Sequence, residues 1–118
     1  MLNNFQTFQL AKKFHWACKD LKVSSFLRDQ LLRASSSIAL NAAEGSGKNT
    51  AREQSRYYSI SLGSLRECQA ILELENINDP MLINMADQLG AMLFSLSRLA
   101  TKPKPQTETA TETDCPGS

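Results

Sequence analysis

The chain of 118 residues has room for one ordinary domain, because single domains cluster at roughly 100 to 150 residues. Hydrophobic residues make up 42% and charged residues 21%, which is typical of globular proteins and excludes an extended disordered chain for most of the length. The net charge of +1, from 13 basic and 12 acidic residues, gives no argument by itself for binding to nucleic acid. No apolar run approaches the ~20 residues needed to cross a bilayer, and the first residues lack a signal-peptide pattern, so we expect a cytoplasmic protein without membrane contact.

Up to residue 100 the apolar residues follow helical spacing, which predicts an all-α protein. The first helix is expected from about residue 3 to residue 21, with this core stripe: Phe5, Phe8, Ala11, Phe14, Cys18 and Leu21. Ser24 or Ser25 can cap a second helix that stops at Gly45 and Gly47. Its stripe is Leu27, Leu31, Ala34, Ile38 and Asn41.

A third helix is expected after Asn49 or Thr50, with Glu53 in the capping-box position relative to Thr50. Its stripe is Tyr58, Leu62, Leu65, Cys68 or Gln69, and Leu72. The fourth helix opens near Asp79 with Pro80 in its first turn, and its heptad stripe is Leu82, Met85, Leu89, Met92, Leu96 and Leu99. Short turns make sequential helices antiparallel, so we predict an up-down-up-down four-helix bundle over residues 1–100.

Residues 101–118 differ sharply from the rest of the sequence. They contain three of the four prolines and no large apolar side chain, so we expect a disordered polar tail. The three cysteines, Cys18, Cys68 and Cys115, are widely spaced and are interpreted as free thiols.

Several large apolar residues fall off the predicted stripes: Trp16, Leu32, Leu40, Ile60, Ile71 and Leu93. One thin bundle has little room to hide them, which favours a homo-oligomer in which another copy covers part of this surface. The alternative is that scattered exposed leucines are ordinary on a monomer.

The segment AAEGSGKNT, residues 42–50, looks in part like a nucleotide-binding P-loop. The pattern GxxxxGK(S/T) needs glycine at Ala42 and a hydroxyl at Asn49, and it follows a strand, so we predict a helix end and a turn instead. His15 is the only histidine, and no serine, cysteine or carboxylate is forced near it by spacing. The glutamates lack the Glu-x-x-His pairs of a di-metal bundle. We therefore expect a protein that is not an enzyme, with no cofactor, no metal and no small-molecule substrate.

Small and polar residues are dense on the second and third predicted helices. Gly63 lies in mid-helix, where glycine costs ~1 kcal/mol relative to alanine, so we expect something to pack tightly against it. Four polar residues would then be partly buried and would form a structural network that fixes helix register: Arg33, Asn41, Glu44 and Glu67.

The stretches QLLRASSSIALNAAEGSGK, residues 30–48, and YYSISLGSLRECQAIL, residues 57–72, resemble the four-helix-bundle family of 23S rRNA intervening-sequence proteins. The matching pattern is Arg33-Ala34, Ser37-Ile38, Asn41, Glu44-Gly45, Gly63-Ser64 and Glu67. That family includes the accessory variability determinant, the small partner of reverse transcriptase in diversity-generating retroelements. The resemblance implies a ring-like homopentamer, whose basic surface in the retroelement members engages nucleic acid and reverse transcriptase.

Two functions from different classes are expected. The first is an accessory protein that binds RNA or DNA weakly and without sequence specificity, in the company of a reverse transcriptase. Its candidate phosphate contacts are Lys12, Lys13, Lys19, Arg28, Lys48, Arg52 and Arg56. The last three are spaced by four and stack on one face, which a five-fold ring would repeat into a continuous positive surface. The alternative is a protein–protein interaction scaffold that does not bind nucleic acid, and it is favoured by the near-neutral net charge.

Overall fold

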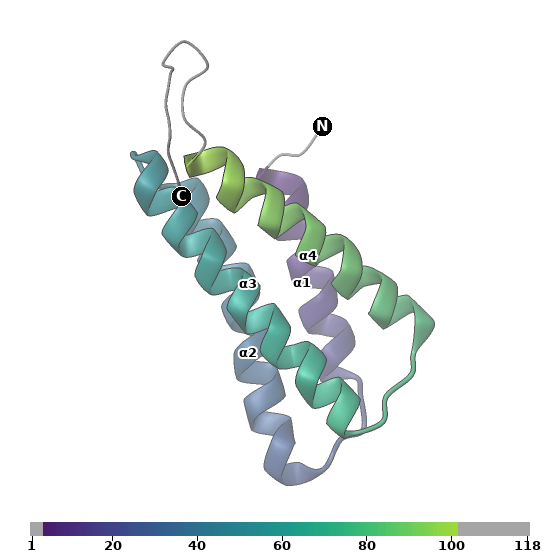
Figure 1. The fold of residues 1–118 in the computed structure, drawn as a ribbon. Coiled ribbons are helices and arrows are strands. Elements are labelled where there is room, and N and C mark those ends of the chain that lie inside the picture. Colours follow the sequence, from purple (N-terminus) through teal and green to yellow (C-terminus); the bar gives the residue numbers. More distant parts are fainter. Residues whose placement is uncertain (1–3, 102–118) are drawn as a thin grey trace.

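A computed structural model of the chain describes residues 4–101, with side chains described up to Arg98. All of the secondary structure in this range is helical: α1 spans Asn4–Lys19, α2 Ser25–Ser46, α3 Ala51–Leu74 and α4 Pro80–Thr101 (Figure 1). The prediction of an all-α protein with four helices is confirmed. Thr101, the first residue of the predicted polar tail, is the last residue of α4. Residues 102–118, with Cys115, and the side chain of Leu99 lie outside the described residues.

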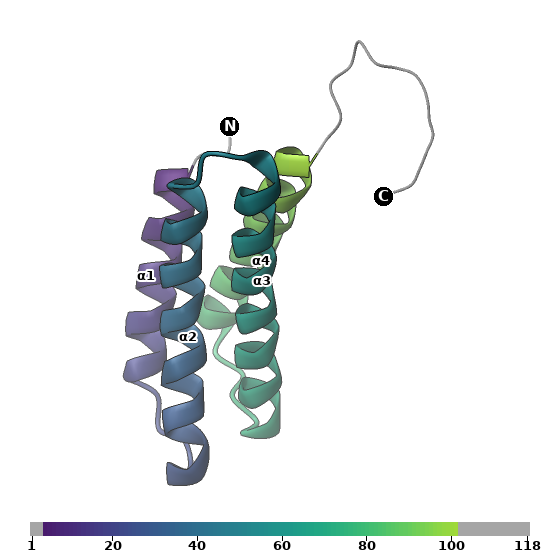
Figure 2. The same cartoon turned by 90° about the vertical axis from the view of Figure 1, so that its left-hand side faces the viewer.

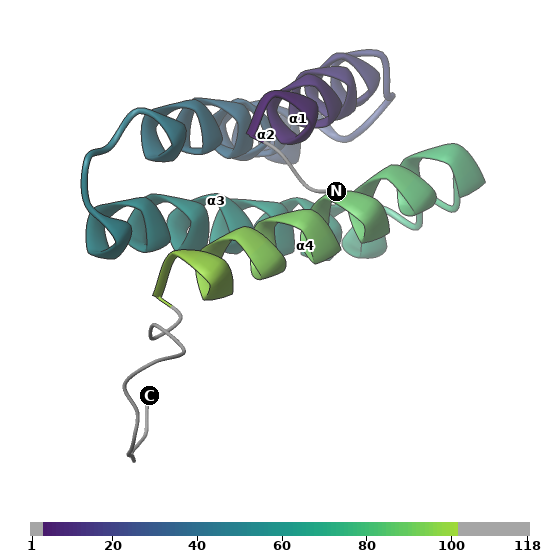
Figure 3. The same ribbon diagram turned by 90° about the horizontal axis from the view of Figure 1, so that it is seen from above.

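The four helices form two layers, α1 with α2 and α3 with α4 (Figure 3). The most extensive contact joins α2 to α3 across the layers, and the contact between α1 and α4 is smaller. Two sets of hydrogen bonds show which helix ends meet. Ser24, just before α2, bonds to Glu75, just after α3, and the Tyr58 hydroxyl in α3 donates to Oδ1 of Asn4 at 2.8 Å. The turn between α2 and α3 lies at the same end of the molecule as the start of α1 (Figure 2).

The core is built from the predicted stripes of all four helices. On α1 and α2 the buried members of these stripes are Ala11, Phe14, Cys18, Leu31, Ala34 and Ile38. On α3 and α4 they are Tyr58, Leu65, Cys68, Leu72, Leu82, Leu89 and Leu96. Helical spacing therefore identified the side of each helix that faces the core.

Three predictions about single apolar positions were wrong. Phe5 was placed in the core stripe, but it is 71% exposed, because three successive steps of three residues carry it half a turn away from Phe14. Ile71 and Leu93 were placed off the stripes, but both are buried. Leu93 lies four residues after Leu89 and so continues the same helix face.

The end of α2 also differs from the prediction, because the helix continues through Gly45 to Ser46. Gly45 is buried, and a Cβ atom there would lie 3.1 Å from both Cβ of Tyr57 and Cε1 of Tyr58. Its small size therefore lets α2 lie directly against α3. Gly47 is the residue that ends the helix, and its N–H donates to the carbonyl of Glu44. The segment that looks like a P-loop is thus the last turn of α2 and its cap.

The two ends of α3 are set by local hydrogen bonds. At its start, Oγ1 of Thr50 accepts from the N–H of Glu53 at 3.2 Å, as the capping-box pattern predicts. At its end, Asn76 adopts a left-handed backbone with φ of 57°. The N–H groups of Asn76 and Ile77 donate to the carbonyls of Glu73 and Leu72, which is a Schellman motif.

Ser24 stands before α2 as predicted, but it bonds to a distant carboxylate. Its N–H donates to Oε1 of Glu75 and its hydroxyl donates to Oε2, both at 2.8 Å. These two bonds, the backbone one first, hold the pKa of Glu75 below its usual value, because they stabilise the charged form. Glu75 therefore ties the start of α2 to the end of α3.

The pH dependence of thermal stability in Glu75→Gln tests this contact between Ser24 and Glu75. A carboxyl group whose pKa is lower in the folded state stabilises the protein above its unfolded pKa, and that contribution is lost as the pH falls through the folded pKa. We expect Tm of the wild type to exceed that of Glu75→Gln near neutral pH, and the gap to shrink as the pH falls below 4.5. Glu73→Gln, on the exposed side of α3, is the matched control. A gap that does not change with pH would contradict the role of the carboxylate.

Candidate nucleic-acid interface

The seven basic residues predicted to contact nucleic acid lie in three regions of the described structure. Three lysines lie on α1 and one arginine lies near the start of α2. The last three are Lys48 in the turn between α2 and α3, and Arg52 and Arg56 in the first two turns of α3. We call this last group the basic turn, and it consists of Lys48, Arg52, Arg56 and the neighbouring Tyr57.

The basic turn gathers its charges around one aromatic ring. Nζ of Lys48 lies 5.1 Å from the centroid of the Tyr57 ring, and the guanidinium carbon of Arg56 lies 5.8 Å from it. Both distances are within the range of cation–π attraction. Arg52 is exposed one helical turn before Arg56. The structure therefore brings Lys48 and Arg56 together through Tyr57, with Arg52 on the same helix beside them.

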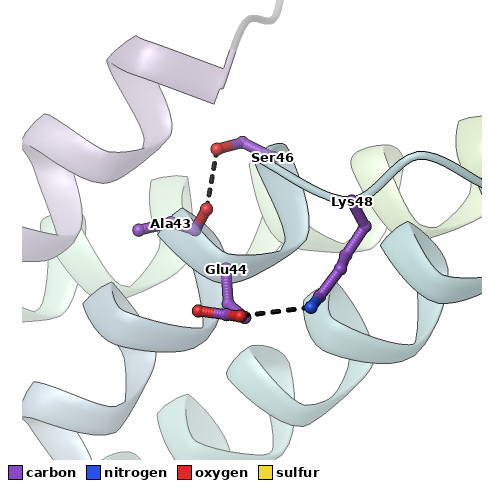
Figure 4. Close-up of polar contacts among 4 residues, drawn as sticks. All are labelled: Ala43, Glu44, Ser46 and Lys48. Carbon is purple, nitrogen blue, oxygen red and sulfur yellow. Dashed lines mark hydrogen bonds and ion pairs between the residues drawn. The ribbon is translucent and has the colours of Figure 1, made fainter.

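Backbone packing holds the basic turn in place. Gly45 has no side chain, so Cβ of Tyr57 packs directly against α2. Nε2 of Gln54 donates to the carbonyl of Lys48 at 3.1 Å, which links the turn to the first part of α3. The Ser46 hydroxyl donates to the carbonyl of Ala43 at 2.8 Å in the last turn of α2 (Figure 4).

Two glutamates weaken the positive charge of the basic turn. Nζ of Lys48 lies 3.2 Å from Oε2 of Glu44 (Figure 4). That hydrogen bond is the main reason why the pKa of Lys48 is raised, with further contributions from Tyr57 and Glu53, so the lysine stays charged at neutral pH. The three cations and two carboxylates of this region give a net charge of only +1 (3 − 2) on one chain.

Arg28 has a clear structural role within the chain. Its Nη1 donates to the carbonyl of Leu21 at 3.1 Å and its Nη2 donates to the carbonyl of Lys19 at 3.2 Å. A cation at the carboxyl end of a helix is favoured by the helix dipole and by the free carbonyls there. Arg28 therefore helps to close the end of α1.

The lysines of α1 have a different environment. Nζ of Lys12 lies 5.9 Å from the ring centroid of Phe8 and 5.2 Å from that of Trp16, whereas Lys13 and Lys19 are exposed. These cations were predicted from the sequence, but the aromatic partners of Lys12 were not. Spacing of four residues within α1 is a signal that could have identified the pairs with Lys12.

The structure does not join the four predicted network residues to one another. Arg33 and Glu67 are exposed, and Glu44 is exposed and paired with Lys48. Glu67 accepts from Nε2 of Gln30 at 2.9 Å, which is a contact between α2 and α3 at the surface. The small residues on α2 and α3 were expected to bring the two helices close enough to bury Arg33, Glu44 and Glu67. The helices instead contact each other through other side chains, and these three charged residues stay at the surface.

Serines form polar contacts between α2 and α3 that lie deeper than the surface pair of Gln30 and Glu67. Asn41, which is half-buried, donates through Nδ2 to both the carbonyl and the hydroxyl of Ser37 at 2.9 Å. The Ser37 hydroxyl lies 2.8 Å from that of Ser64, and the buried hydroxyl of Ser61 donates to the carbonyl of Ile38 at 2.7 Å. This hydroxyl-lined contact was foreseen only as a density of small residues.

Gly63 lies on the exposed side of α3, and no atom outside its own helix backbone lies within 4 Å of the position that a Cβ would occupy. The tight packing expected at this glycine is therefore not present within the described chain.

His15 lies beside a serine, which the spacing did not foresee. Its Nδ1 is 2.6 Å from Oγ of Ser35, which is fully buried and also donates to the carbonyl of Leu32. Burial, followed by the nearby Lys19, lowers the pKa of His15, so the imidazole is neutral at neutral pH. Since the Ser35 hydroxyl is enclosed, the pair satisfies a buried polar group and is not placed to attack a substrate.

Cys18 and Cys68 are buried free thiols. Burial raises the pKa of Cys18 to about 12 and also raises the pKa of Cys68, so both thiols are protonated and poorly reactive. In the part of the chain that the structure describes, no three His, Cys, Asp or Glu residues are grouped in a way that could hold a metal ion. No described helix has both the length and the apolar character that spanning a membrane requires.

Comparison with known families gives one match. The family model described as 23S rRNA-intervening sequence protein matches residues 5–102, which includes nearly all of the four helices. No curated protein and no solved structure matches the chain.

Gly45 gives a direct test of the packing beneath the basic turn. Gly45→Ala forces a methyl group against Tyr57 and Tyr58, so we expect a loss of about 1 to 3 kcal/mol in the free energy of unfolding. Gly47→Ala is the matched control, because its Cβ would meet only ordinary contacts at 3.7 and 3.9 Å. It should be neutral or stabilise by about 0.4 to 1 kcal/mol. Equal unfolding free energies for the two variants in urea would contradict the close approach.

Proposed function

The chain belongs to the 23S rRNA-intervening sequence protein family, and from this premise we propose that it is a non-enzymatic accessory protein that binds RNA or DNA through charge. The observation that carries the proposal is the basic turn, in which Lys48 and Arg56 are held around Tyr57 next to the exposed Arg52. Contacts of this kind reach phosphates and carry no base information. Binding is therefore weak, sensitive to salt and independent of sequence. A cytoplasmic location and a reverse transcriptase partner are part of the same proposal.

The fold in this proposal is an antiparallel up-down-up-down bundle that assembles as a ring-like homopentamer. The bonds of Ser24 with Glu75 support opposite directions for α2 and α3. The apolar surface supports assembly, because Leu40 on α2 and Ile60 on α3 are 67% and 40% exposed. Gly63, with open space beside it on α3, leaves room for a close neighbour.

Assembly would change the chemistry of two groups of residues. Five copies of a turn with a net charge of +1 would form a ring of cations, and the salt dependence of binding to duplex DNA grows with the number of phosphates neutralised. Arg33 and Glu67, exposed on one protomer, would find partners across the contact between copies. The predicted polar network would then fix the register between subunits.

A protein–protein scaffold is the second candidate, and one observation favours it. Lys48 is paired with Glu44, so part of the charge of the basic turn is already neutralised within the protomer. In this case the exposed apolar residues of α2 and α3 would bind another protein, and nucleic acid would not bind even at low salt.

Removing the basic turn tests the first function. We expect Lys48→Ala/Arg52→Ala/Arg56→Ala to weaken binding to structured RNA and duplex DNA by about tenfold or more at low salt, because three phosphate contacts are lost. Fluorescence anisotropy of labelled nucleic acid at low and moderate salt measures this effect, and the slope against salt concentration should also become shallower.

The matched control removes three basic residues from elsewhere on the surface, Lys22→Ala/Arg66→Ala/Arg98→Ala. Both triple variants lower the net charge from +1 to −2 (1 − 3), so a difference between them reports position and not total charge. Equal binding by the two triple variants would exclude the basic turn as the interface. No binding by the wild type at low salt would leave the scaffold function.

A further inference from the structure

α1 presents a second stripe of residues to solvent, on the side away from the core. Its members recur at steps of three or four residues, and we call them the aromatic–lysine stripe: Phe5, Phe8, Lys12, Trp16 and Lys19. Phe5 is 71% exposed and Trp16 is 53% exposed. The other side of α1 is occupied by its packing in the core, so this stripe is free within the protomer.

Lys12 connects the aromatic residues of the stripe. Its Nζ lies between Phe8 and Trp16, at 5.9 and 5.2 Å from their ring centroids. The ammonium group of Lys12 thus lies next to two aromatic rings, and Lys12 is half-buried. The stripe therefore offers charge and flat apolar surface together.

Positive charge gathers on this part of the molecule. Residues 4–19 contain three lysines and no carboxylate, whereas the neighbouring α2 holds two arginines and two carboxylates and adds no net charge. Residues 4–98 as a whole hold 11 basic and 9 acidic residues, a net charge of only +2. Within that range, none of the lysines of α1 forms an ion pair with a carboxylate.

We propose that the aromatic–lysine stripe binds single-stranded nucleic acid, with bases stacked on Trp16 and Phe5 and phosphates contacting Lys12 and Lys19. This inference rests on the proposed function and specifies its substrate class. Aromatic side chains next to cations bind unpaired bases irrespective of sequence, because every base has a flat face. Bases in a duplex are already stacked on each other, so the stripe prefers single strands.

Two other occupants fit the stripe less well. A helix that lies on a membrane buries an apolar face and keeps its charges on the opposite side, whereas Lys12 lies in the middle of the aromatic residues. Lipid insertion would therefore draw its ammonium group among acyl chains. Symmetric pairing of two copies through this stripe would bring lysines together with no carboxylate on α1 to compensate them.

Trp16 is the only tryptophan of the chain, so its fluorescence reports directly on the stripe. The full chain is titrated with a labelled oligothymidylate, with the matching RNA homopolymer and with a duplex of the same length, while Trp16 emission and the anisotropy of the label are followed together. We expect the single strands to quench Trp16 as they bind, and the duplex to leave its emission nearly unchanged. Acrylamide should quench Trp16 in the free protein, because its ring is exposed.

Trp16→Ala should weaken binding of the single strand by about tenfold, as expected for the loss of one stacked base. Phe26→Ala is the matched control, because Phe26 is an aromatic residue that is 78% exposed at the start of α2, outside the stripe. It should bind like the wild type. Both residues are exposed, so both variants should keep the wild-type Tm, which thermal unfolding checks.

Each contrary outcome has a separate meaning. Anisotropy that rises without any change in Trp16 emission overturns the stripe and leaves the proposed function standing. Anisotropy that stays flat for all nucleic acids at low salt overturns both. Trp16 emission that shifts with phosphatidylserine vesicles, but not with oligonucleotides, identifies a lipid surface and overturns the stripe as a nucleic-acid site. Resistance of Trp16 to acrylamide in the free protein shows that another copy covers it, and this also overturns the inference.

Discussion

Gly45 lets the last turn of α2 lie against α3, and this close approach determines much of the remaining structure. A larger residue would meet Cβ of Tyr57 and the ring of Tyr58 at 3.1 Å. Further along the same contact, the Ser61 hydroxyl reaches the backbone of Ile38 at 2.7 Å, which satisfies a buried polar group. Because Tyr57 is fixed against α2, cations from both sides of the turn reach its ring.

The same contact has a cost, because small hydroxyl-bearing side chains bury little apolar surface. The large residues nearby, Leu40 and Ile60, point to solvent, and Gly63 has open space beside it. The basic turn and its two glutamates carry a net charge of +1 on one chain. So small a net charge attracts a polyanion only weakly. Assembly of several copies would cover the exposed apolar residues and would also bring several basic turns onto one surface.

Helical periodicity predicted the four helices and most of the core, because both follow from spacing along one helix. The same rule misplaced Phe5, since repeated steps of three residues rotate away from the core side. Spacing along one helix cannot predict contacts between residues that are far apart in the sequence. Ser24 and Glu75 meet across 51 positions, and Lys48 reaches Tyr57 across a turn whose geometry depends on how closely α2 approaches α3. The serine next to His15 was missed for the same reason, as it belongs to another helix.

We propose that further copies of the chain cover the exposed surface of α2 and α3. Sedimentation equilibrium of the wild type and of Ile60→Asp, over a wide range of concentration, tests it most directly. We expect a wild-type mass near five times the 13.1 kDa of one chain, and a shift toward a single chain in the variant, because a carboxylate would be buried at the contact. A wild-type mass of 13.1 kDa at every concentration would contradict the claim.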